Sequence, residues 1–202
     1  MLGRKSKICV LISGGGTNLQ ALLDAEKENR IKSGEIVLVA SDNPSAYGLT
    51  RAKNSLKETY ILNNEADFIT ELESKQIDMI VLAGFLKILS PEIVKLYENR
   101  IINIHPSLIP SFCGKGCYGL HVHERALEYG VKITGATVHF VNEITDGGKI
   151  ISQKAVEVLE NDTPEILQRR VMEEAEWILL PKATEDLAFK IKEGLIYMNQ
   201  RA

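Results

Sequence analysis

The chain has 202 residues, 45% of them hydrophobic and 25% charged, and a formal net charge of −3 at pH 7. This composition is typical of a globular protein and argues against a disordered chain or a polyanion-binding surface, so we expect no nucleic-acid partner. No apolar run approaches the roughly 18 residues that a membrane span needs. We therefore expect one cytoplasmic domain over residues 1–202, without membrane contact.

Apolar runs and helical patterns alternate through the first half of the chain. We expect strands at residues 7–12, 35–40, 59–62, 78–83 and 101–104, and helices between them at 18–29, 46–54, 64–75 and 92–99. Asn64, and Ser90 followed by Pro91, are typical of residues that begin a helix. This alternation predicts an α/β fold, with a Rossmann-like, mostly parallel sheet and helices on both faces.

The second half of the chain departs from this alternation. A glycine-rich loop, SFCGKGCYGL, precedes a helix near residues 123–129, and two strands at 133–141 and 149–158 are joined by NEITDG, which predicts a hairpin. A further helix begins at Asp162 or Thr163. This helix runs to Pro181, and its apolar stripe is formed by Leu167, Val171, Ala175 and Ile178. A last helix follows near residues 184–191.

The segment SGGGTN connects the first strand to the first helix. Ligands of parallel sheets bind at the carboxyl ends of the strands, and exposed backbone N–H groups at a helix N-terminus suit a phosphate. No Lys-Ser or Lys-Thr pair follows, and Leu19 stands where dinucleotide-binding loops carry a third glycine, so a nucleoside triphosphate and NAD are disfavoured. The alternative is a tight turn that binds no ligand.

Asn103 and His105 stand two residues apart at the end of the fifth strand, so their side chains face the same side. An amide donor beside an imidazole, whose unperturbed pKa is about 6.5, suits a carbonyl that becomes an oxyanion, as in acyl or formyl transfer. The alternative for His105 is a structural hydrogen bond. Asp146 is either a plain turn residue or a carboxylate that keeps His105 protonated and relays protons. We expect His139 to support the site or the fold.

Three cysteines, Cys9, Cys113 and Cys117, provide no even disulfide framework, so we expect reduced thiols. Cys113 and Cys117 lie close in sequence to His121 and His123, which together offer four zinc-ligand side chains. Zinc modules usually separate their ligand pairs by more chain than this. The sequence therefore favours two free thiols on a glycine-rich loop over a metal site.

With these motifs the chain resembles the folate-dependent glycinamide ribonucleotide formyltransferases of purine synthesis. The resemblance covers nearly the full length and rests on ISGGGTNLQALLDA, SDNPSAYGLTRA, VLAGFLKILSP, IINIHPSLIPSF, GATVHFVNEITDGGKII and, more loosely, EAEWILLP. It implies a seven-stranded formyltransferase fold, small-molecule substrates, 10-formyltetrahydrofolate as co-substrate, no metal requirement, and a monomer or homodimer.

The resemblance also implies roles for individual residues. It gives the catalytic centre as Asn103, His105 and Asp146, the phosphate site as Gly16, Thr17 and Asn18, and the contact to the glycinamide portion as Glu176, counted back from Pro181. It gives the folate pocket as Leu86, Lys87, Ile88, Leu89, Asn103, Asn142, Glu143, Ile144, Thr145 and Asp146. The implied reaction is direct attack of the primary amine on the formyl carbon through a tetrahedral intermediate.

Three segments depart from the family pattern. ILNNEADFITEL lacks the basic residue often found there for the glutamate tail of the folate, which leaves Lys87 or no residue for that role. The loop that contains Cys113 and Cys117 is longer than in many relatives, and Trp177 replaces a common histidine. The competing hypotheses are formyl transfer to methionyl-tRNA or an amino sugar, hydrolysis of the formyl-folate, and nucleotide binding without catalysis.

Overall fold

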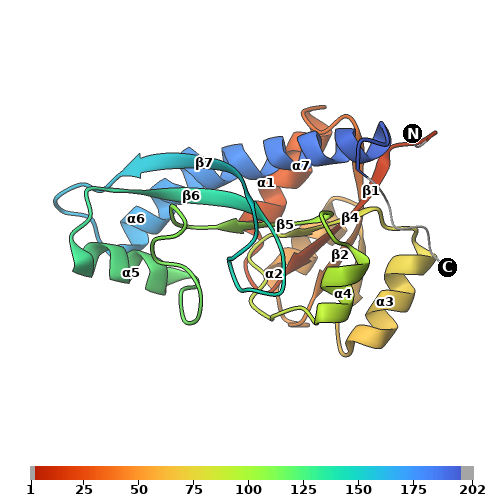
Figure 1. Cartoon of the computed structure of the whole chain (residues 1–202), viewed down its shortest axis with the longest axis horizontal. Helices are drawn as coiled ribbons and strands as arrows, with labels where there is room; N and C mark the ends of the chain where they lie inside the picture. Colours follow the sequence, from red (N-terminus) through yellow and green to blue (C-terminus); the bar gives the residue numbers. More distant parts are fainter. Residues whose placement is uncertain (1–2, 197–202) are drawn as a thin grey trace.

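Seven strands form one sheet in the order β3-β2-β1-β4-β5-β6-β7 in the computed structural model, which describes residues 3–196 (Figure 1). The strands are β1 Ser6–Ile12, β2 Gly34–Ser41, β3 Glu58–Ile61, β4 Met79–Leu82, β5 Ile101–His105, β6 Ile133–Phe140 and β7 Ile150–Glu157. The first five pair in parallel, whereas β5–β6 and β6–β7 are antiparallel. The predicted mostly parallel sheet and its terminal hairpin are therefore confirmed.

Helices cover both faces of the sheet, as predicted (Figure 1). They are α1 Thr17–Lys27, α2 Tyr47–Asn54, α3 Glu65–Ser74, α4 Pro91–Leu96, α5 Leu120–Tyr129, α6 Pro164–Val171, the π-helix η1 Met172–Glu176 and α7 Trp177–Lys192. Within residues 3–196, none of them is both long and apolar enough to cross a membrane.

The central strand β1 shows how the two cores are divided. Ile8, Val10 and Ile12 pack with α1, α2, α6 and α7 on one face, while Cys9 and Leu11 pack with α3 and α4 on the other. All five side chains are fully buried. This is the burial that a continuous apolar run has in a parallel sheet. It leaves the carboxyl edge of the sheet, with the loops that follow β1, β4 and β5, for a ligand.

Three helices begin at side chains that cap their first turn. The Asn64 side chain accepts a hydrogen bond from the Asp67 N–H at 2.8 Å, and the Ser90 hydroxyl accepts one from the Ile93 N–H at 3.4 Å. Thr163 is the N-cap of α6. The predicted starts of α3 and α4 are confirmed. Of the two residues predicted to begin the C-terminal helix, Thr163 and not Asp162 is its N-cap.

The C-terminal helices differ from the prediction in two ways. Pro181 does not end a helix but lies inside α7, and Ile178 is 49% exposed, so the expected apolar stripe is wrong at its last member. The cause is η1, because a π-turn takes more residues than an α-turn and shifts the phase of every side chain after it. Leu179 and Leu180 therefore face the core in place of Ile178.

Candidate active site

Asn103 and His105 stand at the carboxyl end of β5, where the strand reaches the edge of the sheet. Both line a cavity of about 670 Å³ that extends to the glycine loop after β1, and His105 is only 4% exposed. Residues two apart on a strand share a face, so the two side chains project into the same space. The predicted juxtaposition of an amide and an imidazole is present in the structure.

Asp146 lies in the connection between β6 and β7, in the left-handed region at φ 55°. Its Oδ2 lies 3.7 Å from Nδ1 of His105, and its Oδ1 lies 3.6 Å from Nε2 of His139. Oδ2 also accepts a hydrogen bond of 2.8 Å from the Gly114 N–H. The hairpin therefore folds over the end of the sheet and brings the carboxylate to His105.

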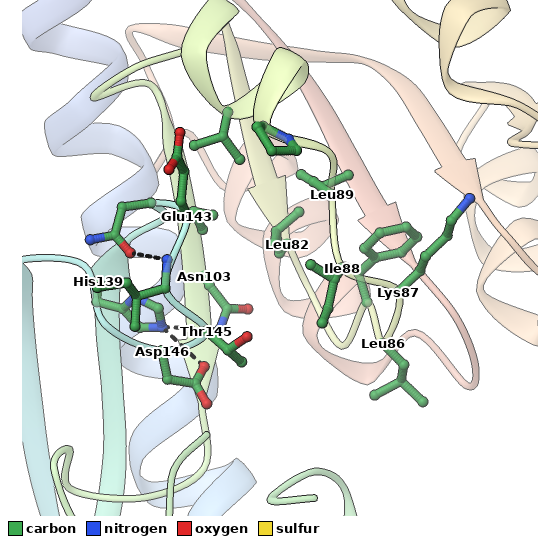
Figure 2. A pocket seen from close by; sticks show the side chains of 16 residues that line it. Leu82, Leu86, Lys87, Ile88, Leu89, Asn103, His139, Glu143, Thr145 and Asp146 are labelled. Carbon is green, nitrogen blue, oxygen red and sulfur yellow. Dashed lines mark hydrogen bonds and ion pairs between the residues drawn. The ribbon is translucent and has the colours of Figure 1, made fainter. Parts of the chain in front are cut away.

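His139 orients the amide of Asn103. Nδ1 of His139 lies 2.8 Å from the Phe140 carbonyl oxygen, which only accepts, so this nitrogen carries the proton. In the neutral imidazole Nε2 is then an acceptor, and Nδ2 of Asn103 donates to it at 3.1 Å, as Figure 2 shows. One amide hydrogen of Asn103 is thus committed to His139, and the second is left for a ligand. His139 supports the site rather than only the fold.

His105 is held in one tautomer by the loop after β5. Its Nε2 donates to the Phe112 carbonyl oxygen at 2.9 Å, which leaves Nδ1 toward Asp146. Burial lowers the pKa of His105 below its ordinary value, and the negative charge of Asp146 opposes this only in part. The expectation that Asp146 keeps His105 protonated is therefore wrong for the ligand-free protein, because desolvation of the imidazolium outweighs the attraction of the carboxylate.

At Asp146, unlike at His105, the neighbouring groups affect the pKa more strongly than burial does. Burial acts to raise its pKa, but the neighbouring imidazoles of His139 and His105 and the Gly114 N–H together bring the pKa below its ordinary value. The carboxylate is therefore ionised at neutral pH and can accept a proton. A neutral imidazole and an ionised carboxylate side by side form a pair that can move a proton between a substrate and the site.

The loop between β5 and α5 supplies two main-chain contacts that sequence reasoning missed. The carbonyl of Phe112 fixes His105, and the N–H of Gly114 fixes Asp146. Both residues have positive φ, at 48° and 83°. The only sequence signal was the glycine-rich character of SFCGKGCYGL, which indicates an unusual backbone but not which groups it presents.

The four side chains suggested as zinc ligands do not converge. His123 is 1% exposed and lines the large cavity, whereas His121 is exposed and lies 2.7 Å from a Glu124 carboxylate oxygen. Cys113 and Cys117 are free thiols. Among residues 3–196, no group of three or more His, Cys, Asp or Glu side chains is arranged to hold a metal ion.

The glycine loop and η1 form the other end of the large cavity. Gly16 is the N-cap residue of α1, has φ 70° and provides no side-chain cap, so the first N–H groups of the helix are left for a ligand. Asn18 lines the cavity, as do Ser13 and Gly14. Gly16 and Thr17 do not: the Thr17 hydroxyl contacts the Met172 sulfur at 3.6 Å instead.

Glu176 is brought to the glycine loop by the π-turn. It is 5% exposed and accepts a hydrogen bond of 3.1 Å from Nδ2 of Asn18. Burial raises the pKa of Glu176 to about 7, and the Asn18 hydrogen bond opposes this in part. Glu176 at the cavity wall is therefore protonated much more readily than an exposed glutamate.

A second cavity of about 210 Å³ lies between the β4–α4 loop and the β6–β7 connection, and Figure 2 shows its lining. All residues of the predicted folate pocket line it: Leu86, Lys87, Ile88, Leu89, Asn103, Asn142, Glu143, Ile144, Thr145 and Asp146. Leu86, Ile88 and Ile144 are 59%, 74% and 69% exposed, so apolar side chains face open space at its rim. A ligand with a flat apolar face would cover them.

The two cavities meet at the candidate catalytic residues. Asn103 and Asp146 line both of them, together with Phe85, Leu86, Ile88 and Thr145. The loops behind the cavities are also joined, because the Ser13 hydroxyl accepts a hydrogen bond of 2.9 Å from the Leu86 N–H. The arrangement brings two different ligands to one pair of polar side chains.

Comparison with known proteins agrees with this geometry. The formyl transferase family model matches residues 6–184. The chain therefore belongs to the formyl transferase family. Within it, the chain is 39% identical over 207 residues to the phosphoribosylglycinamide formyltransferase of Haemophilus influenzae, a match that covers 97% of this chain and 95% of that protein. Its full-length similarity is thus to the phosphoribosylglycinamide formyltransferases.

Two further relatives are also named as a formyltransferase or transformylase. The chloroplastic phosphoribosylglycinamide formyltransferase of Arabidopsis thaliana is 35% identical over 85% of this chain, which spans 62% of the length of that plant protein. The crystal structure of glycinamide ribonucleotide transformylase 1 from Symbiobacterium toebii has a TM-score of 0.85 and 40% identity, covering 98% of this chain and 93% of that one. The predicted formyltransferase fold and family are confirmed.

Proposed function

We propose that the protein transfers the formyl group of 10-formyltetrahydrofolate to the primary amine of glycinamide ribonucleotide. The observation that carries the proposal is that Asn103 and Asp146 line both cavities at the point where these meet, with His105 beside them. A reaction between two bound small molecules requires its polar groups at such a junction. The similarity to phosphoribosylglycinamide formyltransferases over nearly the whole chain supports the choice of substrates.

The large cavity suits the ribonucleotide. The N–H groups at the start of α1 attract its phosphate, since a helix N-terminus carries partial positive charge. Asn18 stands between this loop and the carboxyl group of Glu176, which accepts hydrogen bonds from the glycinamide portion. This directs the amine of the ribonucleotide toward Asn103 and Asp146.

The smaller cavity suits the reduced folate, because its walls combine apolar side chains with polar groups of the β6–β7 connection. Leu86, Ile88 and Ile144 cover the faces of the folate rings, and Lys87 at the rim attracts the glutamate tail. When bound, the folate supplies the formyl group to be transferred.

The residues of the chain then act on the reacting atoms in a defined order. Asn103 donates its second amide hydrogen to the formyl oxygen as the amine nitrogen bonds to the formyl carbon, and this stabilises the developing negative charge. That charge also raises the affinity of neighbouring His105 for a proton, which makes it a second donor. Asp146 accepts the proton released by the amine and returns it to the folate nitrogen as the old carbon–nitrogen bond breaks.

An absorbance assay for the deformylated folate tests this function. The purified protein is mixed with 10-formyltetrahydrofolate with and without glycinamide ribonucleotide, and formylated ribonucleotide is quantified by mass spectrometry. The expected result is product formation only when the ribonucleotide is present, with equal amounts of both products. Folate product without acceptor would instead indicate a hydrolase, and no turnover with acceptor would reject the proposed reaction.

A further inference from the structure

Three successive carbonyl groups of the glycine loop are bound from behind by the segment between β2 and the middle of α2. Nδ2 of Asn43 donates to the Ser13 carbonyl at 3.3 Å, the Gly48 N–H to the Gly14 carbonyl at 3.0 Å, and Nε of Arg51 to the Gly15 carbonyl at 2.8 Å. No other stretch of residues 3–196 makes such a set of contacts to this loop.

These contacts fix the direction in which the loop presents its N–H groups. In a trans peptide the N–H points opposite to the carbonyl of the preceding residue. Holding the carbonyls of Ser13, Gly14 and Gly15 toward α2 therefore turns the N–H groups of Gly14, Gly15 and Gly16 to the other side. Within residues 3–196, these three N–H groups have no protein acceptor. They are the donors that an anion would use.

Arg51 is held rigidly by a contact on each side. Nη1 donates to the side-chain oxygen of Gln20 in α1 at 3.1 Å, and the guanidinium lies 5.1 Å from the centroid of the Tyr47 ring. The guanidinium group of Arg51 thus connects the loop, α1 and α2. A lysine at this position would keep the charge but has no second, fixed N–H direction to make the same connection.

The backbones of the loop and α2 also touch directly. A side chain at Gly16 would place its Cβ 2.6 Å from Cα of Gly48, and one at Gly48 would place its Cβ 3.2 Å from Cα of Gly16. Glycine is therefore needed at both positions for this approach. The contact brings α2 close enough for Arg51 to reach the Gly15 carbonyl.

We propose that Arg51 is a positioning residue of the phosphate site: by binding the Gly15 carbonyl, its guanidinium orients the loop N–H groups toward the phosphate of the ribonucleotide. This rests on the proposed function in one respect, that the glycine loop is the phosphate site. Arg51 acts through the loop, and its positive charge behind the loop adds to the attraction for the anion. Its loss weakens binding of the phosphate and of no other part of the substrate.

The test compares two ligands and three variants by calorimetry without folate. The ligands are glycinamide ribonucleotide and the glycinamide riboside that lacks the phosphate. The variants are Arg51→Met, Arg51→Lys and the control Arg30→Met. The control removes an equal charge from an exposed side chain that pairs with Glu28 and that lies beside a surface depression also lined by Arg51. Melting temperatures show that each variant is folded, and Arg51→Lys takes the place of Arg51→Met if the latter unfolds.

The expected result is a Kd for the ribonucleotide that rises roughly tenfold or more in both Arg51 variants, with an unchanged Kd for the riboside and an unchanged kcat at saturating substrate. Arg30→Met should bind both ligands like the wild type. Wild-type affinity in Arg51→Lys would overturn the positioning role, because charge alone would then suffice. Equal losses for both ligands would overturn it as well, since they indicate general damage.

The same data separate this inference from the proposed function. A wild-type protein that prefers the ribonucleotide to the riboside through Arg51, yet transfers no formyl group, would support the positioning role and reject the reaction. A wild-type protein that binds both ligands equally would overturn the role of Arg51 while leaving the formyl-transfer assay to decide the reaction.

Discussion

The amide of Asn103 and the imidazole of His139 are cross-strand partners in the β5–β6 ladder and are joined by a hydrogen bond of 3.1 Å. The same imidazole lies 3.6 Å from the Asp146 carboxylate. One buried histidine thus sets the orientation of the candidate oxyanion donor and contributes to the low pKa of the candidate proton acceptor. His139 is therefore a positioning residue for both groups, and it also lines the smaller cavity.

We expect His139→Leu to lower kcat roughly tenfold or more, because the Asn103 amide loses the acceptor that orients it. The variant should also shift the acidic limb of the kcat–pH profile to higher pH, since the neighbouring imidazole that helps to lower the pKa of Asp146 is gone. His139→Gln, which keeps an acceptor oxygen, should restore part of kcat. A pH profile identical to that of the wild type would contradict the link between His139 and Asp146.

Asn103→Ala removes the proposed donor to the formyl oxygen. Loss of one such donor typically lowers turnover roughly 100- to 1000-fold, so kcat should fall by that amount while the melting temperature changes little. Asn99→Ala, at an exposed position between α4 and β5, is the control. Steady-state kinetics with both substrates would refute the assignment if Asn103→Ala kept near-normal turnover.

The burial of Glu176 predicts that the free energy of unfolding depends on pH. Its pKa rises from 4.5 in the unfolded chain to about 7 in the folded protein, because its charged form is buried. The folded state therefore binds the extra proton between these values, and stability from this group falls as pH rises from about 4.5 to about 7. The glutamine of Glu176→Gln does not titrate. The free energy of unfolding of the variant, relative to that of the wild type, should therefore be up to about 3 kcal/mol higher at pH 8 than at pH 5.

Urea unfolding of the wild type and Glu176→Gln at both pH values measures this difference. Glu185→Gln serves as the control, because that carboxylate is only half-buried and binds the main chain near Ser33. Parallel stability–pH curves for the wild type and Glu176→Gln would show that Glu176 is ionised in the folded protein without cost, contrary to its burial.

The apolar rim of the smaller cavity should govern folate affinity. Ile144 is 69% exposed in the ligand-free protein and lines the smaller cavity but not the large one, and we expect Ile144→Asp to raise KM for the folate roughly tenfold, since a contact with the rings is replaced by a charge. KM for the ribonucleotide should not change. Ile166→Asp, at a half-exposed position in α6, is the control. A rise in both KM values would place Ile144 outside a folate-specific site.

Sequence patterns were sufficient to predict the sheet and the ends of its strands. The apolar run of β4 and the strand-loop-helix pattern around SGGGTN predict parallel strands with a ligand at their carboxyl ends. The two-residue spacing of Asn103 and His105 follows from the pleat of a strand alone. The approach of Asp146 to His105 was expected only if the hairpin folds over the sheet, because no local pattern sets that distance.

Other features depend on contacts that a one-dimensional pattern does not contain. The hydrogen bond between Asn103 and His139 follows from the register of β5 against β6, and the low pKa of His105 follows from its burial. The π-turn of η1 leaves Ile178 exposed and Pro181 inside a helix, since its extra residue per turn is invisible to a search for the 3.6-residue period.

The most direct test of the account is the rate of formyl transfer in a single turnover of Asp146→Asn, with both substrates bound, compared with the wild type and with the exposed control Asp186→Asn. Because Asp146 is taken to be the proton acceptor at the junction of the two cavities, the transfer step should slow at least roughly 100-fold in Asp146→Asn, while the Kd values of both substrates stay close to those of the wild type. A near-normal transfer rate in Asp146→Asn would contradict the account.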